Sequence, residues 1–458
     1  MYKSDFLAGA AQVKTTPALG TRINGDFVTH YAKYVHDDLY AKCLVFQKGA
    51  ISIAMVVVDI CIMPKSFIDE TKRQIEVATG IPYRQIFISS THTHAAGSVA
   101  DVHLGSMDPA YAQKLPGLIV SSVLNAIQNL APAKIAFGSV QAPEHLRCRR
   151  YRMTSDYTPI NPVTGQPDVI KTNPIGVEDH IIESIAPTDP ELGYLAVQDL
   201  EGRWIGLLAN YSLHYVGDWE NGTISADYFG VFAASLTDQL GVGDTDFVCI
   251  MSNGTSGDVN IWDFLNSEAY PKEYFAKSKL IGNDLALRVY ADLPKLSWQL
   301  NPVLRFAYED IEASVVKPTQ EELSLAGEIV SKTDFEDIVM DQTGLRQLYA
   351  REQILLHEFS DVVICPIQAI QIGDGCIGTL PGEFFSETGL YLKKKVSIGS
   401  YFTISMANGN VGYVPPASEI VKGGYETWRC RYSCLKPETE ATMREHLLTL
   451  IQSLKLNV

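Results

Sequence analysis

A strand–helix–strand pattern in the first hundred residues constrains the fold of this chain more than any other feature. Residues 51–59 (ISIAMVVVD) are almost continuously apolar, as expected of a strand buried on both faces. Residues 65–80 (KSFIDETKRQIEVATG) carry apolar side chains at helical spacing and end in glycine, which predicts a helix and its stop. A second apolar run follows at residues 86–88. The pattern is typical of a βαβ unit and predicts an α/β fold.

Two histidines stand directly after the second predicted strand. The run turns polar at residues 89–91 and continues into His92 and His94. Residues two apart in an extended chain point the same way, so both imidazoles can lie side by side at the strand end. Ligands of such sheets bind beyond the carboxyl ends of the strands. This is the geometry of a metal site, but the spacing alone does not select it over the alternative, two hydrogen-bonded loop histidines.

Composition limits the classes of partner. The 458 residues are 46% hydrophobic and 20% charged, as in an ordinary globular chain, and the net charge is −16. This acidic excess argues against a nucleic-acid partner, which needs a basic surface. The N-terminus lacks the pattern of a signal peptide, and no apolar run reaches the ~18 residues of a spanning helix. We expect a soluble, cytoplasmic protein without stable membrane insertion.

The cysteines predict neither a metal site nor a disulfide framework. There are eight, none in a CxxC pair, and several lie in apolar runs such as VVVDIC and DFVCIM. A thiol in such a run behaves as a small hydrophobe, so we expect most of the cysteines to be free, reduced and structural. Cys430 and Cys434 are close enough in sequence to pair if the protein were exported.

Three further predicted strands end in polar residues. A hairpin around residues 200–203 has a second strand that leads to His214, although a core histidine is the alternative reading. DFVCIMSNGTSGDVN (residues 246–260) is a strand followed by a glycine-containing loop, with Asp258 and Asn260 at its rim. This loop matches neither a phosphate loop nor a GxSxG elbow. Two strands around residues 373–375 lead to the carboxylate of Glu383.

Two other segments have a distinct character. Residues 319–359 are charged and favour helix, and we expect a helical insertion at about 318–360 that covers part of the site. LRCRRYRM (residues 146–153) holds clustered arginines. These arginines form either a solvated basic patch or an anion-binding or carbonyl-polarising group facing a pocket.

Taken together, these landmarks resemble the neutral ceramidase family of zinc-dependent amide hydrolases. The resemblance extends over nearly the whole chain and rests on the order and spacing of many short motifs. They are AAQVKTTPALG, HDDLYAKCLVF, SSTHTHAAG, RRYRM, DPELGYLAV, NYSLH, ISADYFG, NGTSGDVN, LPGEFFSETG and ANGNVGYVPP. It implies one large α/β catalytic domain over residues 1–458, with mixed central sheets flanked by helices.

The resemblance also implies roles for individual residues. Zinc would be held by His92, His214, Glu383 and Tyr413, of which the tyrosine is an unusual zinc ligand that the residues alone did not predict. His94 would transfer a proton or hold the attacking water. Arg149 matches an arginine near the reacting carbonyl, and Asp258 would orient a ligand or the glycine loop.

One position departs from the family pattern. The ceramidases carry a serine with an assigned catalytic role directly after the GDV of this loop, where this chain has Asn260, followed by Ile261 and Trp262. The departure puts ceramide as the substrate in doubt and removes the serine from the mechanism. Asn260 is then a candidate oxyanion donor.

The sequence therefore predicts a zinc hydrolase that cleaves an amide (N-acyl) bond of a small or lipid-like molecule with activated water. The first alternative is hydrolysis of an ester, lactone or sugar-derived bond in a small soluble metabolite. The second is a non-catalytic metal-binding protein that lost catalysis with the serine. The sequence leaves the oligomeric state open.

Overall fold

The fold is built on an eight-stranded sheet with the strand order β17-β15-β14-β9-β1-β5-β6-β7. The computed structural model describes residues 5–266 and 268–456. The strands of the sheet are β1 (Phe6–Lys14), β5 (Tyr40–Lys48), β6 (Ile51–Val58), β7 (Ile86–Ser90), β9 (Ala131–Gln141), β14 (Glu191–Asp199), β15 (Trp204–Tyr211) and β17 (Val248–Asn253). The parallel pair β6–β7 confirms the βαβ unit predicted from the sequence.

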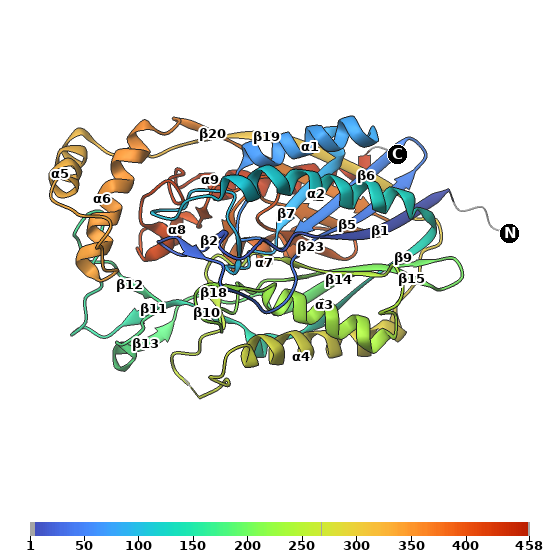
Figure 1. Ribbon diagram of the computed structural model, residues 1–458, viewed down its shortest axis with the longest axis horizontal. Helices are drawn as coiled ribbons and strands as arrows, with labels where there is room; N and C mark the ends of the chain where they lie inside the picture. The colour runs from blue at the N-terminus through green and yellow to red at the C-terminus, as the bar shows by residue number, and fades with distance from the viewer. Residues whose placement is uncertain (1–4, 267, 457–458) are drawn as a thin grey trace.

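The sheet divides into two halves at its centre. β1 and β9 pair only through Leu7↔Pro132 and Ala8↔Ala131, whereas their outer neighbours pair over most of their length. Beyond that short pairing the halves turn toward each other, and one hydrophobic core holds side chains from both, including Leu44 and Leu208. Figure 1 shows the halves as adjacent layers. The ends of β7 and β15 are thereby brought to the same region of the molecule.

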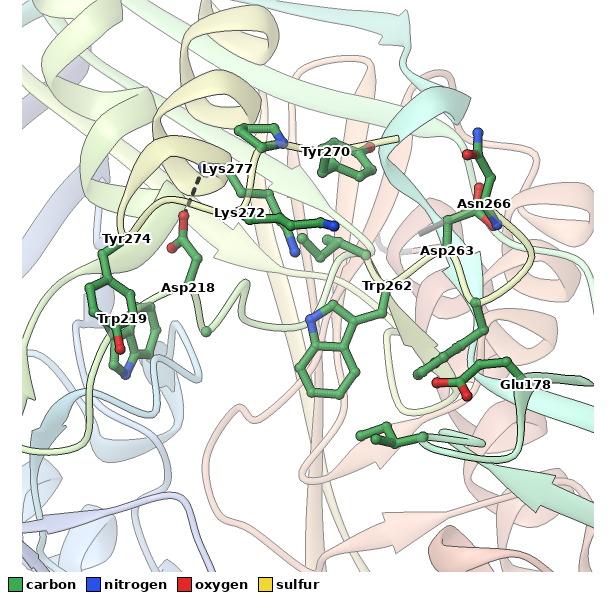
Figure 2. A pocket seen from close by; sticks show the side chains of 15 residues that line it. Glu178, Asp218, Trp219, Trp262, Asp263, Asn266, Tyr270, Lys272, Tyr274 and Lys277 are labelled. Carbon is green, nitrogen blue, oxygen red and sulfur yellow. Dashed lines mark hydrogen bonds between the residues drawn. The ribbon is translucent and has the colours of Figure 1, made fainter. Parts of the chain in front are cut away.

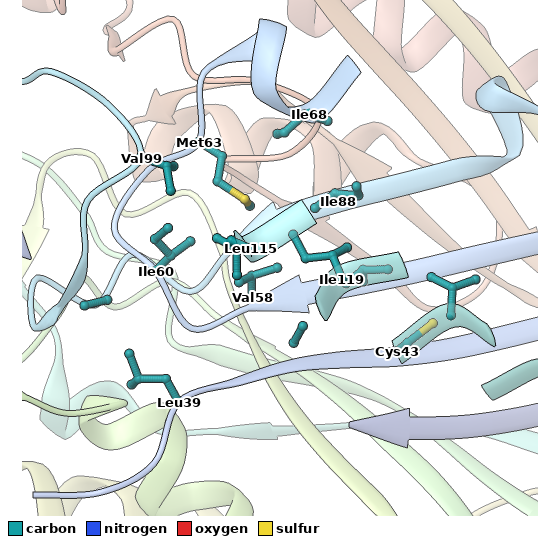
Figure 3. Close-up of a cluster of buried hydrophobic side chains, with 14 of the residues drawn as sticks. Leu39, Cys43, Val58, Ile60, Met63, Ile68, Ile88, Val99, Leu115 and Ile119 are labelled. Carbon is teal, nitrogen blue, oxygen red and sulfur yellow. The ribbon is translucent and has the colours of Figure 1, made fainter. Parts of the chain in front are cut away.

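Helices cover the outer face of each half. α1 (Lys65–Thr79) and α2 (Pro109–Gln128) lie over β5, β6 and β7, and α3 (Asp227–Leu240) and α4 (Ala276–Asp292) lie over β14, β15 and β17 (Figure 1). Val56 and Val58 of β6 pack in the cluster that holds Leu115 and Ile119 of α2, part of which is drawn in Figure 3. Val57 points the other way into the central core. Burial on both faces explains the continuous apolar run.

A second sheet, with the order β19-β20-β21-β23, packs against the central core. Its strands are β19 (Leu304–Ser314), β20 (Val362–Ile372), β21 (Gly375–Thr379) and β23 (Tyr401–Ile404). Its other face is covered by α9 (Thr439–Leu456), through residues such as Leu447 and Leu454. α7 (Ser386–Lys395) follows directly after Glu383 and lies beside α9.

The charged block forms two helices, α5 (Gln320–Val330) and α6 (Gln342–Glu358). They lie at one end of the molecule, drawn in orange in Figure 1. The short elements are β2 (Arg22–Asn24), β3 (His30–Tyr31), β4 (Tyr34–Val35), β8 (Ala96–Gly97), β10 (Arg147–Cys148), β11 (Arg150–Met153), β12 (Ile170–Thr172), β13 (Ile181–Ser184), β16 (Thr223–Ile224), β18 (Val259–Asn260), β22 (Glu383–Phe384), β24 (Tyr413–Val414) and α8 (Ala417–Ile420).

The structure confirms the predicted class, a mixed α/β fold with several sheets flanked by helices. All eight cysteines are free and buried, as the sequence led us to expect. Over the residues that the structure describes, no helix combines the length and apolar character needed to span a membrane.

Candidate metal and catalytic site

His92 lies just past β7, where the backbone leaves the sheet. The N–H groups of Thr91 and His92 donate to the carbonyls of Val58 and Ile60, both at 2.9 Å, and so extend the β6–β7 ladder. At His92 the backbone φ is +72°, a left-handed conformation that costs free energy in a non-glycine residue. The surrounding hydrogen bonds hold this conformation and aim the buried imidazole at the end of β15.

The structure brings three of the predicted ligands together. His214, three residues past β15, places its Nε2 3.1 Å from Nε2 of His92. Glu383, at the start of β22, places Oε2 3.5 Å from Nε2 of His92 and 3.8 Å from Nε2 of His214. These three atoms come from distant parts of the chain and could contact one ion. Nε2 of His94 lies 3.4 Å from Nε2 of His92, at the edge of the group.

The outer ring nitrogens show why this cluster fits a cation. Nδ1 of His92 lies 2.9 Å from the carbonyl oxygen of Cys61, and Nδ1 of His214 lies 3.2 Å from that of Ser256. A carbonyl only accepts, so each Nδ1 carries the proton and, in the neutral ring, each Nε2 presents a lone pair. Two lone pairs at 3.1 Å repel unless a cation or proton lies between them. Oε2 of Glu383 is also buried without a hydrogen-bond partner.

The surroundings of the histidines keep two of them neutral. Burial, followed by the nearby positive charges of His92 and Arg149, lowers the pKa of His214 well below its ordinary value. Burial and His92 likewise lower the pKa of His94. Burial also disfavours the charged form of His92, but Cys61 and Glu383 outweigh it and raise its pKa well above the ordinary value. The cluster thus favours one positive charge at its centre, and a divalent cation would provide it.

Tyr413 and Arg149 border the same cluster. β22 and β24 pair in parallel with Glu383 opposite Tyr413, which places the tyrosine beside the carboxylate. Nη2 of Arg149 donates to the Tyr413 hydroxyl at 3.0 Å and to the carbonyl of Gly257 at 2.8 Å. Nε of Arg149 donates to Glu426 at 2.7 Å. Arg149 is buried, so it does not belong to a solvated basic patch.

His94 is held by stacking. Its ring lies 3.7 Å from the ring of Tyr215, with an angle of 16° between the planes. Gly25, with φ +133°, packs against Cβ and Cγ of His94, and a Cβ at Gly25 would lie only 2.5 Å from these atoms. His94, Arg149, His214 and Tyr413 all line a cavity of about 290 Å³. His94 is therefore positioned to act on a molecule in that cavity.

The structure does not bring Asn260 into this group. Its Nδ2 donates to Oδ1 of Asn173 at 2.6 Å, and its Oδ1 accepts from the N–H of Trp262 at 3.0 Å. Asn173, rather than Asn260, lines the cavity. Asp258 supports the site from behind, because its carbonyl accepts from the N–H of Arg149 and its carboxylate accepts from the N–H of Ser386.

Several residues of the site were not predicted from the sequence. Glu426 pairs with Arg149 and, at 2.8 Å, with Arg150, and Tyr215 and Gly25 hold His94. The segment GGYETWRC around Glu426 shows no spacing typical of a site. Only Tyr215, one residue after His214, could have been found by proximity to a predicted ligand.

The comparisons with known proteins concern the fold. No model of a known protein family matches this sequence, and a search of curated proteins gives no match. Two solved structures match over 100% of this chain with 16% sequence identity. One is a ceramidase complexed with C2, with a TM-score of 0.71 over 76% of that chain. The other is a neutral ceramidase from Pseudomonas aeruginosa, with a TM-score of 0.69 over 75% of that chain.

Proposed function

Starting from a fold of the neutral ceramidase type, we propose that this protein is a zinc-dependent hydrolase that cleaves an amide (N-acyl) bond with activated water. The observation that carries the proposal is the pair of Nε2 atoms at 3.1 Å beside a buried, unpartnered carboxylate oxygen. Two imidazoles and a carboxylate are the ligand types that zinc prefers. The fold resemblance to ceramidases supports an N-acyl bond as the bond that is cleaved.

His92, His214 and Glu383 would hold the ion, with Tyr413 beside them as a fourth ligand. The bound ion would supply Lewis acidity, which polarises an acyl oxygen and makes hydroxide available near neutral pH. The carbonyls of Cys61 and Ser256 fix the two ligand rings in the tautomer that presents Nε2. Both rings would thus be ordered before an ion binds.

Arg149 would stabilise the negative charge that develops on the acyl oxygen. Glu426 and the Gly257 carbonyl hold its guanidinium in one orientation, beside the Tyr413 hydroxyl. A preorganised donor of this kind contributes about 3 kcal/mol to the transition state. Because Asn260 is bonded to Asn173, Arg149 is the better placed of the two predicted donors.

His94 would move the proton. Its Nε2 faces the ligand cluster, and the stack on Tyr215 restricts the ring to one plane. Burial lowers the pKa of His94, so the ring is neutral with a free lone pair, and it readily gives up a proton that it takes from the attacking water. It can then give that proton to the leaving nitrogen.

Metal analysis combined with activity tests the proposal. We expect purified protein to contain about one zinc per chain, to lose activity on N-acyl substrates after chelation and to regain it with zinc. His92→Ala and His214→Ala should lose both metal and turnover. His446→Ala, a half-exposed histidine of α9, is the matched control and should lose neither.

A panel of N-acyl amines, esters and lactones decides the bond type. Turnover of the amides alone, or far faster than of the others, supports the proposal. A His92→Ala protein that keeps both metal and turnover contradicts the metal site. Full metal loading with turnover of esters or lactones but not amides contradicts the bond assignment.

A further inference from the structure

A second cavity adjoins the site and has about 660 Å³ of space (Figure 2). Two chain segments pass from one cavity to the other. Asn173 lines the site cavity and Ile175 the second one, and Tyr215 lines the site cavity while Trp219 lines the second. The rings of Tyr215 and Trp219 lie 6.2 Å apart. The two cavities are therefore neighbours along both segments.

The walls of the second cavity are aromatic. Trp219, Trp262, Phe264, Tyr270 and Tyr274 line it, and Figure 2 shows the indole of Trp262 in the middle of the group. These rings are only partly buried, and Tyr274 is 62% exposed. Five aromatic side chains around one hollow therefore leave flat apolar surfaces open to a ligand.

Two polar groups of the cavity lack partners. Oδ2 of Asp218 accepts from the N–H groups of Lys277 and Ser278 at the start of α4, at 2.8 and 2.9 Å. Oδ1 of Asp218 is buried and has no hydrogen-bond partner. Among the residues that the structure describes, Nζ of Lys277 has no ion pair or hydrogen bond and lies 5.8 Å from the centre of the Tyr270 ring. The cavity thus has a free donor in Lys277, close to a carboxylate that attracts it and that has one buried oxygen without a partner.

This combination selects a chemical class of ligand. An alkyl chain would cover the aromatic faces but leave Asp218 and Lys277 without partners in a drier environment, which costs free energy. A sugar ring has apolar C–H faces that stack on aromatic rings and hydroxyls at its edge that both donate and accept. It satisfies both features of the cavity at once.

We propose that this cavity is a glycosyl-binding subsite, in which a sugar ring stacks on Trp262 and bonds to Asp218 and Lys277. The inference rests on the proposed function of the adjoining site, and it names the substrate class as an N-acyl compound that carries a sugar. The acyl bond lies at the ligand cluster, and the sugar extends past Tyr215 into the aromatic cavity. The subsite binds the sugar whether or not the acyl bond is cleaved.

Binding is tested without turnover. Saturation-transfer NMR on the full chain with the methyl glycosides of glucose, galactose, mannose and N-acetylglucosamine should show transfer to at least one of them. Trp262→Ala and Lys277→Met should each reduce that signal at least fivefold. Leu265→Ala is the matched control, because Leu265 is 63% exposed on the same loop and does not line the cavity. Circular dichroism identifies a variant that has not folded.

Turnover gives the second measurement. An N-hexanoyl amino alcohol and its O-glycosides are compared by kcat/KM, and we expect one glycoside to be preferred about tenfold, with the preference lost in Lys277→Met. Sugar binding without any amide turnover supports the subsite and contradicts the proposed function. Amide turnover with no glycoside bound or preferred overturns the subsite alone. Binding of hexanoate in place of every glycoside, weakened by Trp262→Ala, also overturns it.

Discussion

At the scale of single residues, two histidines only two positions apart have different environments. Nδ1 of His92 is fixed by the Cys61 carbonyl and its Nε2 faces His214, whereas His94 stacks on Tyr215 at the cavity edge. We expect His94→Gln to lower kcat by 10²-fold or more, typical of a lost general acid–base group, with zinc content unchanged. His92→Gln should lose the zinc. Metal analysis and steady-state kinetics on both variants measure the difference, and loss of zinc from His94→Gln would contradict it.

Arg149 is predicted to act through the fixed direction of its guanidinium rather than through its charge alone. Arg149→Lys keeps the charge but cannot donate to Glu426, Gly257 and Tyr413 together. We expect kcat/KM to fall about 10²-fold, the usual cost of losing one oxyanion donor. Kinetics and thermal unfolding are measured on the same samples. A loss of activity that only follows the unfolded fraction would show that the arginine is structural.

The sequence predicts the candidate metal ligands better than it predicts the residues that hold the site in place. His92, His214 and Glu383 each follow a recognisable strand, and this supported the ligand set that the family resemblance implied. Tyr413 came only from the resemblance, because a lone aromatic after a strand has no distinguishing pattern. The pairing of Glu426 with Arg149 joins residues 277 positions apart, and no local signal encodes such a contact.

At the scale of elements, α1 carries a buried cation. Nζ of Lys72 has no hydrogen-bond partner and lies 4.8 Å from the centre of the Tyr83 ring and 5.6 Å from that of Tyr308. Burial lowers the pKa of Lys72 to about 7, although Asp69 opposes the shift. The folded protein therefore binds this proton more weakly than the unfolded chain. The buried Lys72 should therefore lower the free energy of unfolding at any pH below the ordinary pKa of lysine. The loss should be complete below about pH 7.

Lys72→Met should remove that cost. The free energy of unfolding of the wild type should rise between pH 7 and 10. In this range Lys72 is still protonated in the unfolded chain but has lost its proton in the folded protein. The variant should lack this rise and be more stable at pH 7 by about 2 kcal/mol. Urea unfolding at several pH values measures both, with the exposed Lys114→Met as control. If the aromatic rings hold the ammonium strongly, the variant will instead be less stable.

Among the elements, the long ones were predictable and the division of the sheet was not. β6 shows an unbroken apolar run and α1 a clear helical period, and each was predicted close to its observed bounds. Within the sheet, the two halves are joined by only two residue pairs, between β1 and β9. Such a short pairing leaves no pattern in sequence, and the packing of one half on the other depends on the central core.

At the scale of the whole molecule, α6 joins distant loops around the site. Glu352 is fully buried and accepts from Arg431 at 2.9 and 3.0 Å, and Oε1 lies 3.7 Å from Nδ1 of His103. The carbonyl of the adjacent Tyr432 accepts from the N–H of Tyr413. The ion pair thus connects the helical block to the strand that carries a candidate ligand.

Glu352 should make the whole fold sensitive to acid. Burial raises the pKa of Glu352, but His103 and Arg431 outweigh it and lower the pKa to about 2, so the folded protein holds this proton more weakly than the unfolded chain. Its stabilisation is complete above about pH 4.5 and is lost as the pH falls toward 2. We expect Glu352→Gln to lose about 3 kcal/mol at pH 7 and to show a weaker pH dependence below 4.5. Glu358→Gln, exposed on the last turn of the same helix, should unfold like the wild type in urea at each pH. Equal stability of Glu352→Gln and Glu358→Gln at pH 7 would show that α6 is held by its apolar contacts alone.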